Sequence, residues 1–172
     1  MHTTARKISL SILALSALGL LGVLAGNSQK TSGDEAAPGA DKQVASNSYE
    51  LQWGDAPPFL PAGAKFVVLQ GDPTKAGVYT IRLKMPSGYR IPPHSHPTTE
   101  DVTVIAGMMT FGMGDTFLDT GGRALGGGGF ACMPAGMNHF AWATGDTVVQ
   151  VHGMGPFEIK YCHPEDDPRN KK

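Results

Sequence analysis

The chain has 172 residues, enough for one domain of ordinary size and a tail, because single domains span about 100–200 residues. Its 23 glycines and 13 prolines disfavour long helices and supply turns, which excludes an all-helical bundle. Lys and Arg (14) nearly balance Asp and Glu (15), and this formal net charge of −1 lacks the basic surface that a nucleic-acid partner requires.

Residues 1–25 have the pattern of an export signal. Arg6 and Lys7 precede an uncharged, apolar run over residues 8–25, the order that a secretion machinery recognises. Small residues stand where a signal peptidase inspects the chain, so we expect cleavage after Ala25 and a secreted or periplasmic protein. The apolar run is also just long enough to cross a bilayer. An uncleaved anchor is therefore the alternative, and the only case in which the membrane is a partner.

Residues 26–48 are predicted to form a flexible linker. They are rich in Gly, Ser, Asp and Ala and contain almost no large apolar side chain. Such a segment buries too little apolar surface to offset the entropy of ordering its backbone. We therefore place the folded domain at residues 49–172.

From Tyr49 onward the sequence predicts short strands. In residues 77–85, apolar side chains alternate with polar ones, a period of two that indicates an extended strand with one buried face. Similar short runs recur at 65–69, 101–106, 108–113, 130–133, 139–142, 147–152 and 157–161. The glycine-rich stretch 121–129 is predicted to be a loop. Short strands separated by Gly, Pro and Asp turns predict an all-β sandwich or barrel.

The candidate chemistry lies in two histidine clusters. His94 and His96 are two residues apart, so in an extended chain their imidazoles share a face. Glu100 follows across Pro97, which interrupts the strand and can turn the carboxylate toward the same point. A proline–glycine turn delivers His139 into a later strand. Imidazoles and a carboxylate suit a borderline divalent metal ion, with His139 as the fourth ligand.

The alternative is that these histidines are solvated residues on strand faces, which is the first expectation for any one of them alone. With 6 His in 172 residues, however, the spacing His-x-His-x3-Glu arises by chance in about six chains per thousand. The set of four residues therefore favours a metal site.

The two clusters resemble the two motifs of the cupin superfamily. The first motif is matched by a glycine, two histidines, a glutamate and a second glycine: Gly88, His94, His96, Glu100 and Gly107. The second is matched by a glycine, a proline, a glycine and a histidine: Gly128, Pro134, Gly136 and His139. Ala143 departs from the pattern, since asparagine is frequent there, but this position is structural. The resemblance covers residues 88–143, roughly a third of the chain.

This resemblance implies a cupin-type jelly-roll β-barrel with a metal ion inside it, and often a homodimer. The ligands would be His94, His96, Glu100 and His139, which leave a divalent ion with a net charge of about +1. A hexacoordinate ion would retain two positions for water, O2 or a chelating acid. Fe or Mn is the favoured cofactor, with Zn, Cu or Ni as alternatives, and the expected partner is a small-molecule ligand or substrate.

The superfamily does not fix the activity, and three functions stay open. The first is a metal-dependent small-molecule oxidoreductase of the dioxygenase type. The second is a non-catalytic metal- and ligand-binding or sensor module. The third is a structural cupin with vestigial ligands. No catalytic residue is predicted beyond the metal ligands.

Other side chains have two interpretations each. A set of apolar side chains near the ligands lines the cavity or fills the core: Met108, Met109, Phe111, Met113 and Met137. Gln150 and His152 share one strand face, pointing into the barrel or lying exposed. His163 is predicted at the surface.

The chain has two cysteines, Cys132 and Cys162. An oxidising compartment would permit a disulfide between them, which closes a loop and stabilises the fold by ~3 kcal/mol. Cys132 lies in an apolar strand, however, where a buried free thiol is equally expected.

Overall fold

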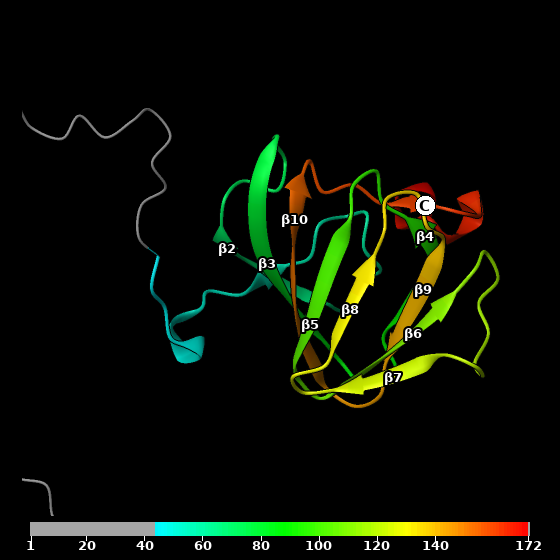
Figure 1. Cartoon of the computed structure of the whole chain (residues 1–172), viewed down its shortest axis with the longest axis horizontal. Coiled ribbons are helices and arrows are strands. Elements are labelled where there is room, and N and C mark those ends of the chain that lie inside the picture. The colour runs from blue at the N-terminus through cyan, green and yellow to red at the C-terminus, as the bar shows by residue number, and fades with distance from the viewer. Residues whose placement is uncertain (1–43, 172) are drawn as a thin grey trace, which may run out of the picture. The chain divides into compact units, whose positions relative to one another are not determined.

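The computed structural model describes residues 44–171. The predicted signal segment at 1–25 and most of the predicted linker lie outside the described residues. The described part is built from two antiparallel sheets that face each other (Figure 1). No helix within residues 44–171 combines the length and the hydropathy required to span a membrane.

Each sheet is assembled from strands that are far apart in the sequence. Sheet 1 has six strands in the spatial order β1 (Gly54–Asp55), β2 (Lys65–Gln70), β3 (Gly77–Met85), β10 (Thr147–Gly155), β5 (Glu100–Ala106) and β8 (Phe130–Met133). Sheet 2 has five in the order β11 (Lys160–Tyr161), β4 (Arg90–Ser95), β9 (His139–Ala143), β6 (Met108–Met113) and β7 (Arg123–Gly126). Short 3-10 turns lie at Ser48–Glu50, Pro164–Asp166 and Pro168–Asn170. Because the chain crosses repeatedly between sheets from β3 to β11, the fold is the predicted all-β jelly roll.

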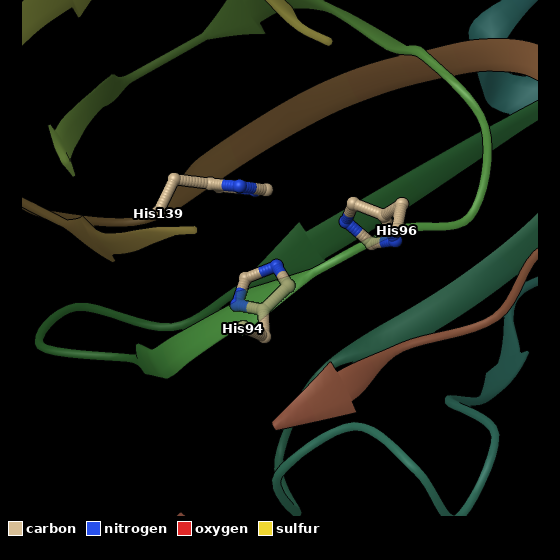
Figure 2. A group of neighbouring side chains, drawn as sticks. All are labelled: His94, His96 and His139. Carbon is tan, nitrogen blue, oxygen red and sulfur yellow. The ribbon is translucent and has the colours of Figure 1, made fainter. Parts of the chain in front are cut away.

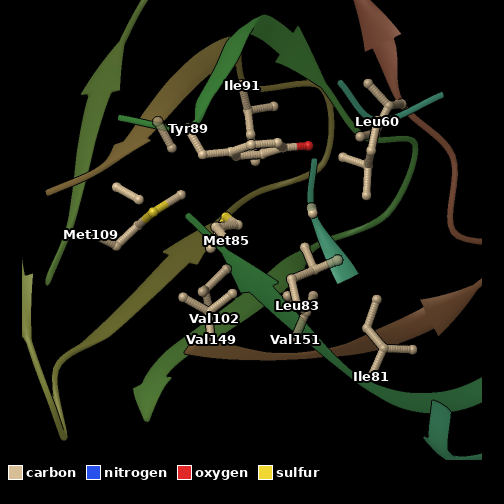
Figure 3. Close-up of a cluster of buried hydrophobic side chains, with 14 of the residues drawn as sticks. Leu60, Ile81, Leu83, Met85, Tyr89, Ile91, Val102, Met109, Val149 and Val151 are labelled. Carbon is tan, nitrogen blue, oxygen red and sulfur yellow. The ribbon is translucent and has the colours of Figure 1, made fainter. Parts of the chain in front are cut away.

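The core lies between the sheets and follows the predicted alternation. In β3 the side chains of Tyr79, Ile81, Leu83 and Met85 are buried, whereas their polar neighbours point outward. Figure 3 shows the side chains of Ile81, Leu83 and Met85 together with others from both sheets, among them Met109 from β6. Each large apolar side chain buried in this way contributes about 1.5–3 kcal/mol. The packed sheets give the inner side chains a rigid support.

The predicted loop at 121–129 is wrong in its centre, because Arg123–Gly126 forms β7 against β6. Gly122 explains how this glycine-rich stretch pairs. A Cβ atom there would lie 2.7 Å from side-chain atoms of both Thr110 and Trp142, so only glycine lets the chain approach the sheet so closely. Composition alone indicated a loop, whereas tertiary packing requires the glycine.

The predicted strand at 157–161 is also too long, since only Lys160–Tyr161 is paired, with β4. Upstream of it, the backbone N–H of Phe157 donates to the carbonyl of Pro73 (2.7 Å) and not to a neighbouring strand. No strand was predicted at Arg90–Ser95, where the structure has β4. The predicted bounds of β3, β6 and β8 are confirmed.

Candidate metal centre

A shift in strand register turns His94 and His96 toward the barrel interior. Simple alternation from the buried Ile91 would point both histidines outward. The pairing of β4 with β9 shifts between Ile91 and His94, where Pro92 and Pro93 have no N–H to donate to the ladder. The irregularity reverses the alternation, and both imidazoles are buried.

Glu100 and His139 reach the same region from strands of the two facing sheets. His139 is the first residue of β9 and pairs directly with His94 in sheet 2. Glu100 is the first residue of β5 in sheet 1, and its side chain shares the inner face with Val102 and Val104. Sheet 2 supplies His94 and His139, His96 directly follows β4 of that sheet, and sheet 1 supplies the carboxylate. All four predicted ligands are buried.

All three imidazoles are held by backbone carbonyls at Nδ1. The acceptors are the carbonyl of Pro92 for His94 (2.7 Å), of Glu158 for His96 (2.7 Å) and of Met137 for His139 (3.0 Å). Because a carbonyl oxygen only accepts, each Nδ1 carries the hydrogen and each neutral ring presents a lone pair at Nε2. Protein ligands of a metal ion have this arrangement, in which an outer hydrogen bond fixes the tautomer.

The lone pairs converge on one region, as Figure 2 shows for the three rings. One ligand atom from each of His94, His96 and His139 lies within 4.8 Å of the others. The Glu100 carboxylate oxygen Oε2 lies 3.4 Å from His96 Nε2 and 3.6 Å from His139 Nε2. His96 Nε2 is nevertheless buried without a hydrogen-bond partner. A buried polar atom left alone is costly, and a metal ion would satisfy it, so these residues fit the ion.

The charge states also suit a cation. Burial lowers the pKa of His94 to about 3, helped by the neighbouring His139 and His96, so this ring stays neutral. Burial alone would raise the pKa of Glu100, but the adjacent His96 and His139 outweigh it and hold that pKa below its usual range. For His96 the signs are reversed: burial lowers its pKa, but the neighbouring Glu100 charge outweighs burial, so that pKa is raised overall. The site thus contains a permanent buried carboxylate.

The space beside these ligands is small and has apolar walls. It encloses about 30 Å³, and a water molecule needs about 10–15 Å³, so a few small atoms fit. Met109 and Phe111 line it, as one interpretation of the sequence predicted. Met108, Met113 and Met137 are exposed, so both predicted roles were wrong for these three.

Comparison with known proteins identifies the family. The model of the ChrR cupin-like domain matches residues 41–158, more than half of the chain. The chain belongs to the ChrR cupin-like family. No curated protein sequence matches this cupin significantly.

Solved structures show the same fold at low sequence identity. A putative acetylacetone dioxygenase from Methylibium petroleiphilum is 19% identical with a TM-score of 0.58, covering 74% of this cupin and 85% of that chain. The polyketide cyclase RemF from Streptomyces resistomycificus is 15% identical with a TM-score of 0.57, covering 74% and 90%. An RmlC-like cupin from Shewanella frigidimarina is 14% identical with a TM-score of 0.51, covering 66% and 92%.

Two polar residues of β10 do not belong to the site of this cupin. Val149 and Val151 face the core, so alternation places Gln150 and His152 on the outer face of sheet 1. The prediction that they point into the barrel was wrong, and the alternative of exposure holds. His163 is exposed, as predicted, with Nε2 2.8 Å from the carbonyl oxygen of Asp115.

Both cysteines are free. The disulfide between Cys132 and Cys162, one of the two alternatives that the sequence left open, is absent from the structure. The alternative of a buried thiol was also wrong for Cys132, which is exposed. It lies on the outer face of β8, because its neighbour Met133 takes the buried position.

Sequence reasoning missed two residues that shape the site. Phe157 stacks on the His96 ring with centroids 5.5 Å apart and an angle of 20° between the planes. The next residue, Glu158, supplies the carbonyl that fixes His96. An aromatic residue in a short apolar run was visible in the sequence, but its contact with a histidine about sixty positions away was not.

Proposed function

We propose that this cupin binds one divalent transition metal ion through His94, His96, His139 and Glu100 and uses it as a small-molecule oxidoreductase. The observation that carries the proposal is the set of three buried rings whose Nδ1 atoms are already bonded. Each ring has only Nε2 left to offer, and the Nε2 of His96 is buried without a hydrogen-bond partner. Glu100 as the fourth ligand is supported by its distances of 3.4 Å and 3.6 Å to two of these rings.

The nitrogen and oxygen donors of the site restrict the bound ion to the divalent transition metals. Three neutral imidazoles and one carboxylate suit Fe or Mn, while Zn, Cu and Ni bind nitrogen ligands at least as strongly. When bound, such an ion supplies a Lewis acid with coordination positions open to a small molecule. The chain contributes the negative charge of Glu100, and the carbonyls at Nδ1 increase the basicity of the rings.

The residues around the site limit the size and polarity of the ligand. The enclosed space of about 30 Å³ admits a ligand of a few heavy atoms, such as O2 or a small carboxylic acid. Phe157 and Ile159 line the space with apolar surface. The fold neighbour described as a putative acetylacetone dioxygenase adds small diketones to the candidates worth testing.

The same small volume also favours a second function, in which the ion and its ligand are held without turnover. A turnover assay distinguishes the oxidoreductase from this binding module. The Fe(II)-loaded chain would be prepared without oxygen and offered small carboxylic acids, diketones and phenols, with O2 uptake as the readout. The oxidoreductase proposal expects substrate-dependent uptake that is lost in Glu100→Gln and kept in His163→Ala. Metal binding with no uptake for any substrate would support the binding module.

We also propose that the chain is exported. The support is the charged and then apolar pattern of residues 1–25 and the small residues before Gly26. Fractionation of expressing cells followed by N-terminal sequencing tests this. We expect the protein outside the cytoplasm with Gly26 as its first residue. A soluble cytoplasmic protein that begins at residue 1 would contradict export, and an intact chain in the membrane fraction would indicate the anchor.

A further inference from the structure

An open groove lies on the surface beside the metal centre. It has a volume of about 780 Å³, and its walls include the turn that contains Gly136, Ser95 and Pro97 on either side of His96, and the segment 158–163. Pockets for small organic ligands usually have about 300–1,000 Å³. The groove is therefore large enough for an organic acid of ordinary size, whereas the enclosed space at the ligands, about 30 Å³, is not.

Two buried side chains form the partition between the groove and the enclosed space. Among residues 44–171, His96 and Ile159 are the residues that line both. Their exposed fractions are 4% and 6%, so the partition is closed in this structure. His96 is bonded at Nδ1 and is a proposed metal ligand. Ile159 is therefore the part of the partition that can vary without loss of the ion.

The extended backbone around Ile159 points its side chain inward. Over 157–161 the first, third and fifth side chains are buried, and the two between them are exposed, which is the alternation of a strand. Two distant side chains hold this segment in place. The carbonyl of Glu158 accepts from Nδ1 of His96 (2.7 Å), and the carbonyl of Ile159 accepts from Nη2 of Arg169 (3.3 Å). Ile159 is thus fixed at the partition from both directions.

Other surface hollows border the enclosed space, but they do not lead to the proposed ligands. Leu60 also lines a hollow of about 320 Å³, and Met85 lines one of about 230 Å³. None of the four proposed ligands lines either of these two hollows. The groove, by contrast, is lined by His96 itself. A solute in the groove is therefore separated from the ligands by the partition alone.

We propose that ligands reach the metal centre from this groove and that Ile159 determines which of them fit. This rests on the proposed metal binding at His94, His96, His139 and Glu100, and adds the residue that sets the size limit. With isoleucine in place, a ligand must fit within the enclosed space, so the class admitted is that of small acids with a short chain. With a smaller side chain, the carboxylate of a larger acid reaches the metal centre while its body lies in the groove.

Acetate and phenylacetate test the size limit, because they share a carboxylate and differ in the bulk behind it. The full chain would be loaded with one equivalent of Co²⁺, whose visible absorption changes when a carboxylate replaces bound water, and titrated with each acid. Loss of this absorption in His96→Ala shows that the ion lies at the inner histidines. Ile159→Ala should bind phenylacetate about tenfold more tightly than the wild type or better, since a pocket discriminates by such a factor for one misfitting methylene. Its affinity for acetate should change much less.

Ile91→Ala is the matched control. Ile91 is 7% exposed and lines the enclosed space but not the groove, so its truncation enlarges the space without opening the partition. The affinity of this variant for phenylacetate should stay at the wild-type level. Ile159→Val, which loses one methyl group, should give a smaller gain than Ile159→Ala in the same direction, and it decides the question if the alanine variant does not fold.

Three results would overturn the role of Ile159. They are Co²⁺-loaded Ile159 variants with no gain in affinity for phenylacetate, an equal gain in Ile91→Ala, and a wild type that binds phenylacetate as tightly as acetate. A chain that binds no Co²⁺ at the inner histidines would instead refute the proposed function, and the role of Ile159 with it.

Discussion

The metal-free protein should lose stability as the pH falls from 6.5 to 4.5, because His94 must stay neutral to remain buried. Its pKa is about 3 in the folded chain, against 6.5 for an ordinary histidine. The unfolded state therefore binds more protons, and this contribution to stability is complete above pH 6.5 and declines as the pH falls. At about 1.4 kcal/mol per unit, two pH units remove about 2–3 kcal/mol.

This pH window isolates His94 from the other two perturbed ligands. His96 has a raised pKa, so its contribution is complete below pH 6.5 and is lost only above it. Glu100 has a lowered pKa, so its contribution is lost only as the pH falls below 4.5. Between these limits neither residue changes its contribution to the free energy of unfolding.

The assay is urea unfolding with a chelator present, followed by tryptophan fluorescence. With a slope of about 1–3 kcal/mol per molar urea, the loss lowers the midpoint by about 1–3 M. The variant His94→Gln cannot titrate, so its midpoint should change little over the same interval, and His163→Gln should behave like the wild type. An equal midpoint for the wild type at both pH values, or an equal loss in His94→Gln, would refute the reasoning.

Two further predictions concern packing. Gly112→Ala should destabilise the protein by about 1–3 kcal/mol, because its Cβ would overlap the ring of Phe140, while Gly126→Ala meets open space and should be nearly neutral. Similar denaturation midpoints for the two variants would contradict this. Met109→Ala empties a buried position and should cost about 2–5 kcal/mol, against roughly 0.5 kcal/mol or less for the exposed Met113→Ala. Calorimetry measures both, and a Met109→Ala protein as stable as the wild type would be unexpected.

Much of the fold followed from local patterns. The period of two in residues 77–85 gave β3 with its correct bounds, because one buried face forces apolar side chains to alternate. The spacing of His94, His96, Glu100 and His139 likewise predicted the residues that the structure brings together. The spacing predicts the geometry well here, because His94 and His96 lie around the end of β4, Glu100 begins β5 and His139 begins β9.

The features that the sequence did not predict depend on contacts between segments that are far apart in the chain. The carbonyl of Glu158 orients His96, and no local pattern in either segment indicates that they meet. The side chain of His152 lies on the outer face of sheet 1 because its neighbour Val151 is buried on the inner face. The sequence alone was compatible with either face. The strand β7 forms inside a glycine-rich stretch because β6 offers a free edge, which composition cannot show.

The most direct test of the central claim is the metal content of purified protein by elemental mass spectrometry. We predict about one transition-metal ion per chain, nearly none in His96→Ala, and no loss in His163→Ala. Circular dichroism should show the same β content in all three proteins. A chain without stoichiometric metal, or a His96→Ala protein that keeps its ion, would contradict the account.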